Sequence, residues 1–175
     1  MGVDTLEQHE ALVSSLMDDA RWPAGGGERQ RIDTHISSVV LAGDHAYKLK
    51  KPVDLGFLNF RTLDDRRSAC EEELRLNRRL APDLYQAICA VTGSIQSPSF
   101  DGPGAVIDWA VRMRRFDPEA VLSNPRIPIT PSLVDRLASR VGAFHLAADR
   151  AADDSEFGTP PLVADPMWRN CTHIR

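Results

Sequence analysis

A tight β-hairpin is the feature that most restricts the folds open to this sequence. Residues 37–42 and 45–51 both have strand character, and only Gly43-Asp44 separates them. A two-residue connection that begins with glycine is typical of a hairpin between antiparallel strands. Pro52 ends the second strand because proline has no N–H to offer a neighbouring strand. The sequence therefore predicts an antiparallel sheet organised around this hairpin.

The second strand of the hairpin places charge on a face that a sheet normally buries. Side chains alternate between the two faces of a strand. Ala46, Lys48 and Lys50 therefore share one face, and Tyr47 and Leu49 share the other. A lysine on the inner face of a sheet is costly unless an opposite charge pairs with it. We therefore expect a carboxylate close to Lys48.

A helix after the hairpin supplies a candidate carboxylate. Residues 62–80 have a helical pattern that begins with Thr62 and Asp65 and ends before Pro82. Glu73 lies on the apolar side of this helix. The residues three, four and seven positions away from it are Ala69, Cys70, Leu76 and Leu80. The most economical arrangement is a pair between Lys48 and Glu73. Alternatively, both side chains extend their charged ends to water at the edge of the core, and spacing alone leaves both arrangements open.

The remaining pattern completes a predicted α+β fold. A capping box of Asp4 and Glu7 predicts an N-terminal helix, and Thr130-Pro131 predicts the start of a third helix. Residues 94–104 read as a loop rich in proline, glycine and serine, and residues from 153 onward as irregular chain. Further strands are predicted over residues 29–34, 85–91 and 105–113, the last with one face formed by Ile107, Trp109, Val111 and Met113. The expected sheet is five-stranded and mostly antiparallel.

Composition excludes several classes of protein. The net charge of -4 argues against sequence-independent nucleic-acid binding, which requires a basic face. Cys70, Cys89 and Cys171 are widely spaced and odd in number, so we expect no disulfide framework and a reducing, cytoplasmic setting. No run approaches the ~20 apolar residues of a membrane span, and the acidic N-terminal region does not resemble a signal peptide.

Several blocks of the sequence resemble one family. A lysine on a third strand that pairs with a glutamate on the next helix is the signature of kinase nucleotide-binding lobes. The blocks that carry the wider match are Thr34-His35-Ile36-Ser37, Gly43-Asp44-His45-Ala46-Tyr47-Lys48-Leu49-Lys50-Lys51-Pro52, Cys70-Glu71-Glu72-Glu73-Leu74-Arg75-Leu76-Asn77-Arg78-Arg79-Leu80-Ala81-Pro82 and Ala110-Val111-Arg112-Met113-Arg114-Arg115-Phe116. They resemble bacterial bifunctional proteins in which an aminoglycoside-phosphotransferase-like domain precedes a P-loop ATP-binding domain.

This resemblance implies a protein-kinase-like N-terminal lobe. Residues 1–28 would be an N-terminal helix and a glycine-rich linker. Residues 29–117 would form the nucleotide-binding lobe, with its sheet and the helix that carries Glu73. Residues 118–175 would be the start of a truncated C-terminal lobe, including its first helix.

The resemblance also implies roles for individual residues around ATP. Lys48 would bind the phosphates, Glu73 would orient Lys48, and Ala46 would cover the adenine. Met113 and Arg115 belong to the segment that would form the hinge beside the adenine.

The loop over the phosphates departs from the protein-kinase pattern, because no G-x-G-x-x-G is present. Thr34, Ser37 and Ser38 would lie in this loop, so phosphate contacts would depend on hydroxyls and backbone N–H groups.

The residues that would carry out phosphate transfer are missing from the pattern. In this family a His-Gly-Asp motif is expected after the third helix, and the sequence has none. We therefore assign no catalytic residue and no metal ligand, and Mg²⁺ would accompany ATP through ligands outside this chain. A missing C-terminal lobe would bind the small-molecule acceptor, so the acceptor is not predictable. The exposed lobe interface leaves self-association open.

Three functional hypotheses follow from the sequence. The first is an ATP-binding lobe of a small-molecule kinase. The second is a non-catalytic relative, a kinase-like domain kept for interaction or regulation. The third is an unrelated α+β binding protein in which Lys48 and Glu73 form a structural ion pair.

Overall fold

The computed structural model describes residues 2–18, 29–152 and 154–173. It divides into two units, Met1–Pro128 and Ile129–Arg175. Most of the predicted glycine-rich linker lies outside the described residues.

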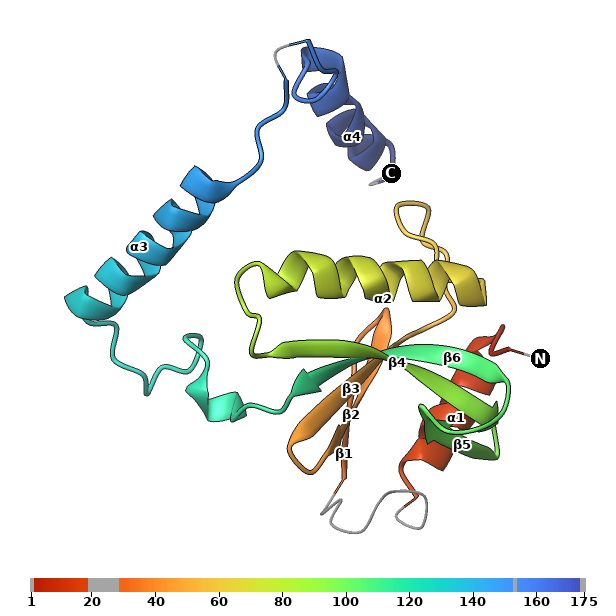
Figure 1. Ribbon diagram of the computed structural model, residues 1–175. Helices are drawn as coiled ribbons and strands as arrows, with labels where there is room; N and C mark the ends of the chain where they lie inside the picture. Colours follow the sequence, from red (N-terminus) through yellow and green to blue (C-terminus); the bar gives the residue numbers. More distant parts are fainter. Residues whose placement is uncertain (1, 19–28, 153, 174–175) are drawn as a thin grey trace. The chain divides into compact units, whose positions relative to one another are not determined.

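The first unit is built on one antiparallel sheet. Its strands are β1 (Gln30–Asp33), β2 (Ser37–Ala42), β3 (His45–Lys50), β4 (Tyr85–Ser94), β5 (Ser97–Phe100) and β6 (Val106–Arg114). Their order in the sheet is β1-β2-β3-β6-β4-β5, and each neighbouring pair is antiparallel (Figure 1). The predicted α+β class and antiparallel sheet are confirmed, but the predicted number of strands was too small by one.

The additional strand lies within the segment predicted as a loop. β5 pairs with the end of β4, so that Ser94 lies opposite Ser97 and Gly93 lies opposite Pro98. A proline is tolerated here because β5 is an edge strand. On the open side of an edge strand no neighbouring strand accepts hydrogen bonds from its N–H groups, so the N–H that proline lacks is not missed. The prediction of a loop over residues 94–104 was therefore wrong for residues 97–100, which form a short edge strand.

The predicted hairpin is confirmed. Ala42 pairs with His45, which leaves Gly43 and Asp44 as the turn between β2 and β3. Gly43 has a φ of 54°, in the left-handed region that glycine adopts without steric cost.

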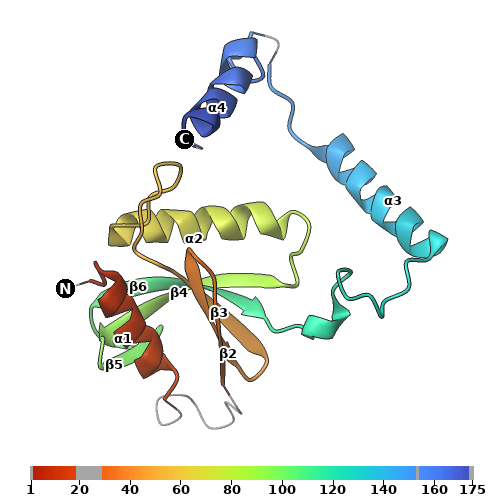
Figure 2. The same ribbon diagram turned by 180° about the vertical axis from the view of Figure 1, so that it is seen from behind.

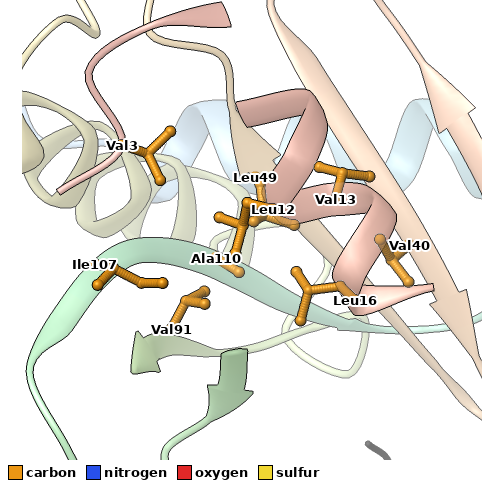
Figure 3. Packing of buried hydrophobic residues seen from close by; sticks show 9 residues of the cluster. All are labelled: Val3, Leu12, Val13, Leu16, Val40, Leu49, Val91, Ile107 and Ala110. Atoms are coloured by element: carbon orange, nitrogen blue, oxygen red, sulfur yellow. The ribbon is translucent and has the colours of Figure 1, made fainter. Parts of the chain in front are cut away.

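Helices α1 (Leu6–Leu16) and α2 (Leu63–Arg78) cover opposite faces of this sheet (Figures 1 and 2). The α1 face carries a buried apolar cluster to which the helix, its preceding segment and four strands contribute. Its members are Val3, Leu12, Val13, Leu16, Val40, Leu49, Val91, Ile107 and Ala110 (Figure 3). Tyr47 packs against the cluster, so Tyr47 and Leu49 face α1 as the alternation in β3 predicts.

Both helices of this unit begin with a capping box. Thr62 caps α2 and exchanges hydrogen bonds with Asp65, as predicted. The box of α1 is formed by Thr5 and Gln8, so the predicted start at Asp4 was wrong by one residue. The Gln8 side chain satisfies the N–H groups of both Asp4 and Thr5, which fixes the cap at threonine.

Strand β6 does not alternate along its whole length. The pairing of β4 with β6 is irregular between Val91 and Thr92, beside the start of β6. Ile107 lies in the cluster under α1, whereas the Trp109 ring contacts Arg67 of α2. The prediction that Ile107 shares a face with Trp109 was therefore wrong, because an irregularity of this kind reverses the side-chain alternation.

After β6 the chain forms a short 3-10 helix, η2 (Pro118–Ala120), and the second unit follows. It holds α3 (Pro131–Ala147) and α4 (Pro160–His173). The predicted start of α3 is confirmed, with Thr130 as the N-cap and Pro131 in the first turn. Helix α4 contradicts the prediction of irregular chain after residue 153. Pro160 and Pro161 occupy its first turn, where a proline removes no helical hydrogen bond, and Pro166 is accommodated inside it.

Apolar side chains of the second unit are exposed on both helices. They include Val134, Leu137, Val141, Leu162, Val163, Met167 and Trp168. Among the residues that the structure describes, no helix combines the length and the apolar character needed to cross a membrane.

Candidate functional site

The predicted ion pair between the sheet and α2 is present. Lys48 Nζ donates to Glu73 Oε1 over 2.8 Å. Lys48 lies in the middle of β3, and Glu73 lies in the third turn of α2, so a strand and a helix of fixed geometry hold the two groups. The alternative, in which both side chains extend separately to water, is wrong.

A second lysine shares the same carboxylate. Lys50 Nζ donates to Glu73 Oε2, and its ammonium also lies 5.3 Å from the centre of the Phe60 ring. The Lys50 side chain is 7% exposed and the Lys48 side chain 26%. The alternation in β3 places both lysines on one face, but sequence reasoning assigned no role to Lys50.

The trio of Lys48, Lys50 and Glu73 has a charge balance that favours the binding of an anion. Burial alone would raise the pKa of Glu73, but hydrogen bonds from Lys48 and Lys50 outweigh it and hold the pKa below its ordinary value. Glu73 is therefore ionised at neutral pH and neutralises one of the two lysines. The three groups together keep one net positive charge, and Lys48 has the more exposed of the two lysine side chains.

Apolar side chains lie beside Lys48 on the same face of the sheet. Ala46 of β3 pairs with Leu41 of β2 on one side and with Met113 of β6 on the other. Paired residues of neighbouring strands point to the same face, and Lys48 is two residues from Ala46. Leu41, Ala46 and Met113 thus form a row across three strands next to the ammonium of Lys48.

The turn between β1 and β2 is compact and is held in place by its own hydroxyl. Thr34 Oγ1 accepts hydrogen bonds from the N–H groups of Ile36 and Ser37. Lys51 Nζ donates to the carbonyl oxygen of Thr34 over 2.7 Å and lies 3.4 Å from the carboxylate of Asp33. Thr34 is exposed at this turn, as the prediction of a loop requires.

Ser37 and Ser38 do not lie in that loop. Both belong to β2 and both are fully buried. Ser38 Oγ donates to Asp33 Oδ1 over 2.6 Å and is 2.9 Å from His9 Nε2. The prediction that these two serines lie over the phosphates was wrong about their position, because the strand begins directly after the turn.

The contact of Ser38 brings together a serine, a histidine and an aspartate that sequence reasoning did not connect. The serine is in the middle of this chain of hydrogen bonds, whereas a nucleophilic triad needs the histidine there. Burial lowers the pKa of His9 to about 4, so its ring is neutral at physiological pH. The three groups therefore fasten α1 to the β1–β2 hairpin.

The segment predicted as the hinge begins where β6 ends. The N–H groups of Arg114 and Arg115 donate to the carbonyl oxygens of Leu84 and Asp44. Met113 is partly buried in the row described above, whereas the Arg115 side chain is exposed. These two bonds fix the backbone at the exit from the sheet and occupy two of the donors that a ligand could otherwise use.

A buried ion pair supports the other end of α2. Arg66 Nε donates to Asp108 Oδ1 over 2.7 Å, and neither side chain is exposed. Arg66 also donates to the carbonyl oxygens of Phe60 and Arg61. Burial raises the pKa of Asp108 to about 6, although the guanidinium of Arg66 opposes this shift. The pair joins the first turns of α2 to β6.

Metal-ligating groups do not cluster in the part of the chain that is described. No three His, Cys, Asp or Glu residues there are placed to share a metal ion. The thiol of Cys70 lies close to the trio, but burial raises its pKa to about 12, so it remains protonated.

Together, the fold and the site define an α+β domain with a cationic, partly apolar surface on one face of an antiparallel sheet. The sequence is similar to three curated mycobacterial proteins, each 36% identical over 146 residues that make up 82% of this chain and 28% of the relative. They are uncharacterized protein Rv2004c and uncharacterized protein MT2060 of Mycobacterium tuberculosis and uncharacterized protein Mb2027c of Mycobacterium bovis. The chain thus spans little more than a quarter of the length of these relatives. No family model and no solved structure matches it.

Proposed function

We propose that this chain is the ATP-binding lobe of an aminoglycoside-phosphotransferase-like small-molecule kinase. One observation carries the proposal: the Lys48–Glu73 ion pair stands beside the apolar row of Leu41, Ala46 and Met113 on one face of the sheet. In kinase lobes a strand lysine holds the α- and β-phosphates, and a helix glutamate positions that lysine.

The two halves of this surface match the two halves of a nucleotide. The surplus positive charge at Lys48 suits a phosphate chain, because charge-assisted hydrogen bonds to anions are among the strongest in proteins. The row across β2, β3 and β6 offers a flat apolar area for a purine ring. Because Ala46 and Lys48 are two residues apart on one strand, the base and the phosphates would lie side by side along β3.

The topology also supports the proposal. The helix that carries Glu73 is inserted between β3 and β4, and the strand that continues into the predicted hinge, β6, lies next to β3. The compact turn at Thr34 stands at the end of the hairpin next to Lys51. Phosphate contacts from this turn would require the Thr34 hydroxyl, or the N–H groups of Ile36 and Ser37, to exchange their hydrogen bonds within the turn for bonds to phosphate.

Mg²⁺ would accompany the nucleotide and neutralise phosphate charge. We assign no residue of this chain to the metal, so the chain alone is expected to bind ATP without transferring phosphate at a useful rate. A kinase-like domain kept for regulation would bind ATP in the same way. Phosphate transfer from labelled ATP to hydroxylated acceptors, measured on a longer protein that includes this chain, separates the two functions.

Isothermal titration with ATP, ADP, AMP and adenosine in the presence of Mg²⁺ tests the proposed site. We expect affinity to rise with the number of phosphates, and Lys48→Met to weaken ATP at least about tenfold while leaving adenosine unchanged. Arg75→Met is the matched control, because it removes one positive charge from the exposed side of the same helix. Equal affinities for ATP in the wild type and in Lys48→Met would exclude Lys48 as a phosphate ligand.

A further inference from the structure

The trio of Lys48, Lys50 and Glu73 has one lysine more than a single strand–helix ion pair needs. Glu73 uses one oxygen for each ammonium, Oε1 for Lys48 and Oε2 for Lys50. The two contacts are therefore separable, and loss of one leaves the other in place.

The surroundings of the two ammonium groups differ. Lys50 is enclosed: its side chain is 7% exposed, and the ring of Phe60 covers its ammonium. A small hairpin holds that ring in place, because Phe60 N–H donates to the carbonyl oxygen of Val53 and Asp54 pairs with Asn59. Lys48 is 26% exposed and lies toward the apolar row of Ala46 and Met113.

We propose that Lys50 is the constant partner of Glu73, so that the ammonium of Lys48 can share its N–H groups between Glu73 and the phosphates of the nucleotide. This inference rests on the proposed function. Lys50 is then a positioning residue: it holds the carboxylate, and through it α2, while the ammonium of Lys48 bonds to both Glu73 and a phosphate oxygen.

The physical reason is the cost of an uncompensated buried charge. If Lys48 were the sole partner of Glu73, a phosphate that shares its ammonium would leave a poorly hydrated carboxylate only partly compensated. The ammonium of Lys50 remains within hydrogen-bond distance of that carboxylate throughout. The cation–π contact with Phe60 in turn holds Lys50 where water does not replace it.

The first experiment compares ligands that differ only in their phosphates. Titration of Lys50→Met is expected to weaken Mg-ATP roughly tenfold and to leave adenosine, which has no phosphate, within about twofold of the wild type. Lys50→Arg keeps the charge and is expected to recover most of the ATP affinity. Lys50→Met with unchanged ATP affinity would overturn the proposal. An equal loss for ATP and adenosine would also overturn it, because it would indicate a structural role only.

The second experiment needs no nucleotide and separates this inference from the proposed function. Lys48, Lys50 and Lys51 are the only lysines of the sequence, so brief acetylation followed by mass spectrometry reports on them individually. In the wild type we expect Lys48 to be acetylated faster than Lys50. In Lys48→Met we expect Lys50 still to react slowly. In Glu73→Gln we expect Lys50 to react fast. Equal rates for Lys48 and Lys50 in the wild type would overturn the assignment of Lys50 as the constant partner. If no nucleotide binds and these rates are as expected, the proposed function fails while the Lys50–Glu73 anchor stands.

Discussion

Arg66 and Asp108 form a fully buried ion pair that joins α2 to β6, with 2.7 Å between Nε and Oδ1. The two residues are far apart in the sequence, and their contact fixes the helix that carries Glu73 over the sheet. Removal of one partner leaves the other charge buried and unpaired, which is the most costly way to disrupt such a pair.

We therefore expect Arg66→Met to lower the free energy of unfolding by about 3–5 kcal/mol. Urea unfolding followed by circular dichroism measures the change. The double variant Arg66→Met/Asp108→Leu should be more stable than Arg66→Met alone, because it leaves no charge behind. Additive losses in the double variant would contradict this account, because they would mean that the two side chains do not stabilise one another.

Stability should depend on the protonation of His9. Burial lowers its pKa to about 4 in the folded protein, from an ordinary value of 6.5. As pH falls through this window the unfolded chain takes up a proton that the folded protein does not, so the free energy of unfolding falls. Between pH 6.5 and about 4 the free energy of unfolding is expected to fall by about 3 kcal/mol in total because of this histidine.

The variant His9→Gln isolates this effect. Glutamine is expected to keep a hydrogen bond to Ser38 without titrating. Chemical unfolding between pH of about 7.5 and 5 should show a smaller loss of stability in the variant than in the wild type. Comparison of the two proteins cancels the opposite contribution of Asp108, whose raised pKa favours the folded state as pH falls. Parallel pH profiles would contradict the assignment of a buried, neutral histidine.

The β4–β5 hairpin should tolerate no side chain at Gly93. This residue has a φ of 95°, and an added Cβ would lie 2.6 Å from the carbonyl oxygen of Ser97. Gly93→Ala is therefore expected to lower the free energy of unfolding by about 1–3 kcal/mol. Gly142→Ala is a suitable control, since an added Cβ there meets no atom within 4 Å. A thermal melt of Gly93→Ala that matches the wild type would contradict the strained turn.

Lys48 and Glu73 were both identifiable as candidate partners from local periods, although spacing alone left their pairing and their separate extension to water both open. The alternation of a strand and the 3.6-residue repeat of a helix each identify a charged residue on a buried face. The same alternation put Lys50 beside Lys48, but the sequence does not show that the loop after β3 folds back and covers Lys50 with Phe60. Depth of burial is a tertiary property.

Other features could not be predicted from local pattern. His9 with Ser38, and Arg66 with Asp108, are contacts between separate elements, so no spacing rule identifies them. Strand β5 and helix α4 were missed because Pro98, Pro160 and Pro161 are usually read as breaks. Each occupies an edge or a first turn, where a proline costs no hydrogen bond.

The central claim is that a nucleotide binds the α2 face of the sheet. Methyl NMR of the protein with labelled Ala, Val, Leu and Met residues, titrated with Mg-ATP, tests it most directly. We expect the largest shift changes at Ala46 and Met113, with small changes at Leu49 and Val91 on the α1 face. A titration that shifts no methyl group, or that shifts Leu49 and Val91 and leaves Ala46 and Met113 unchanged, would contradict the claim.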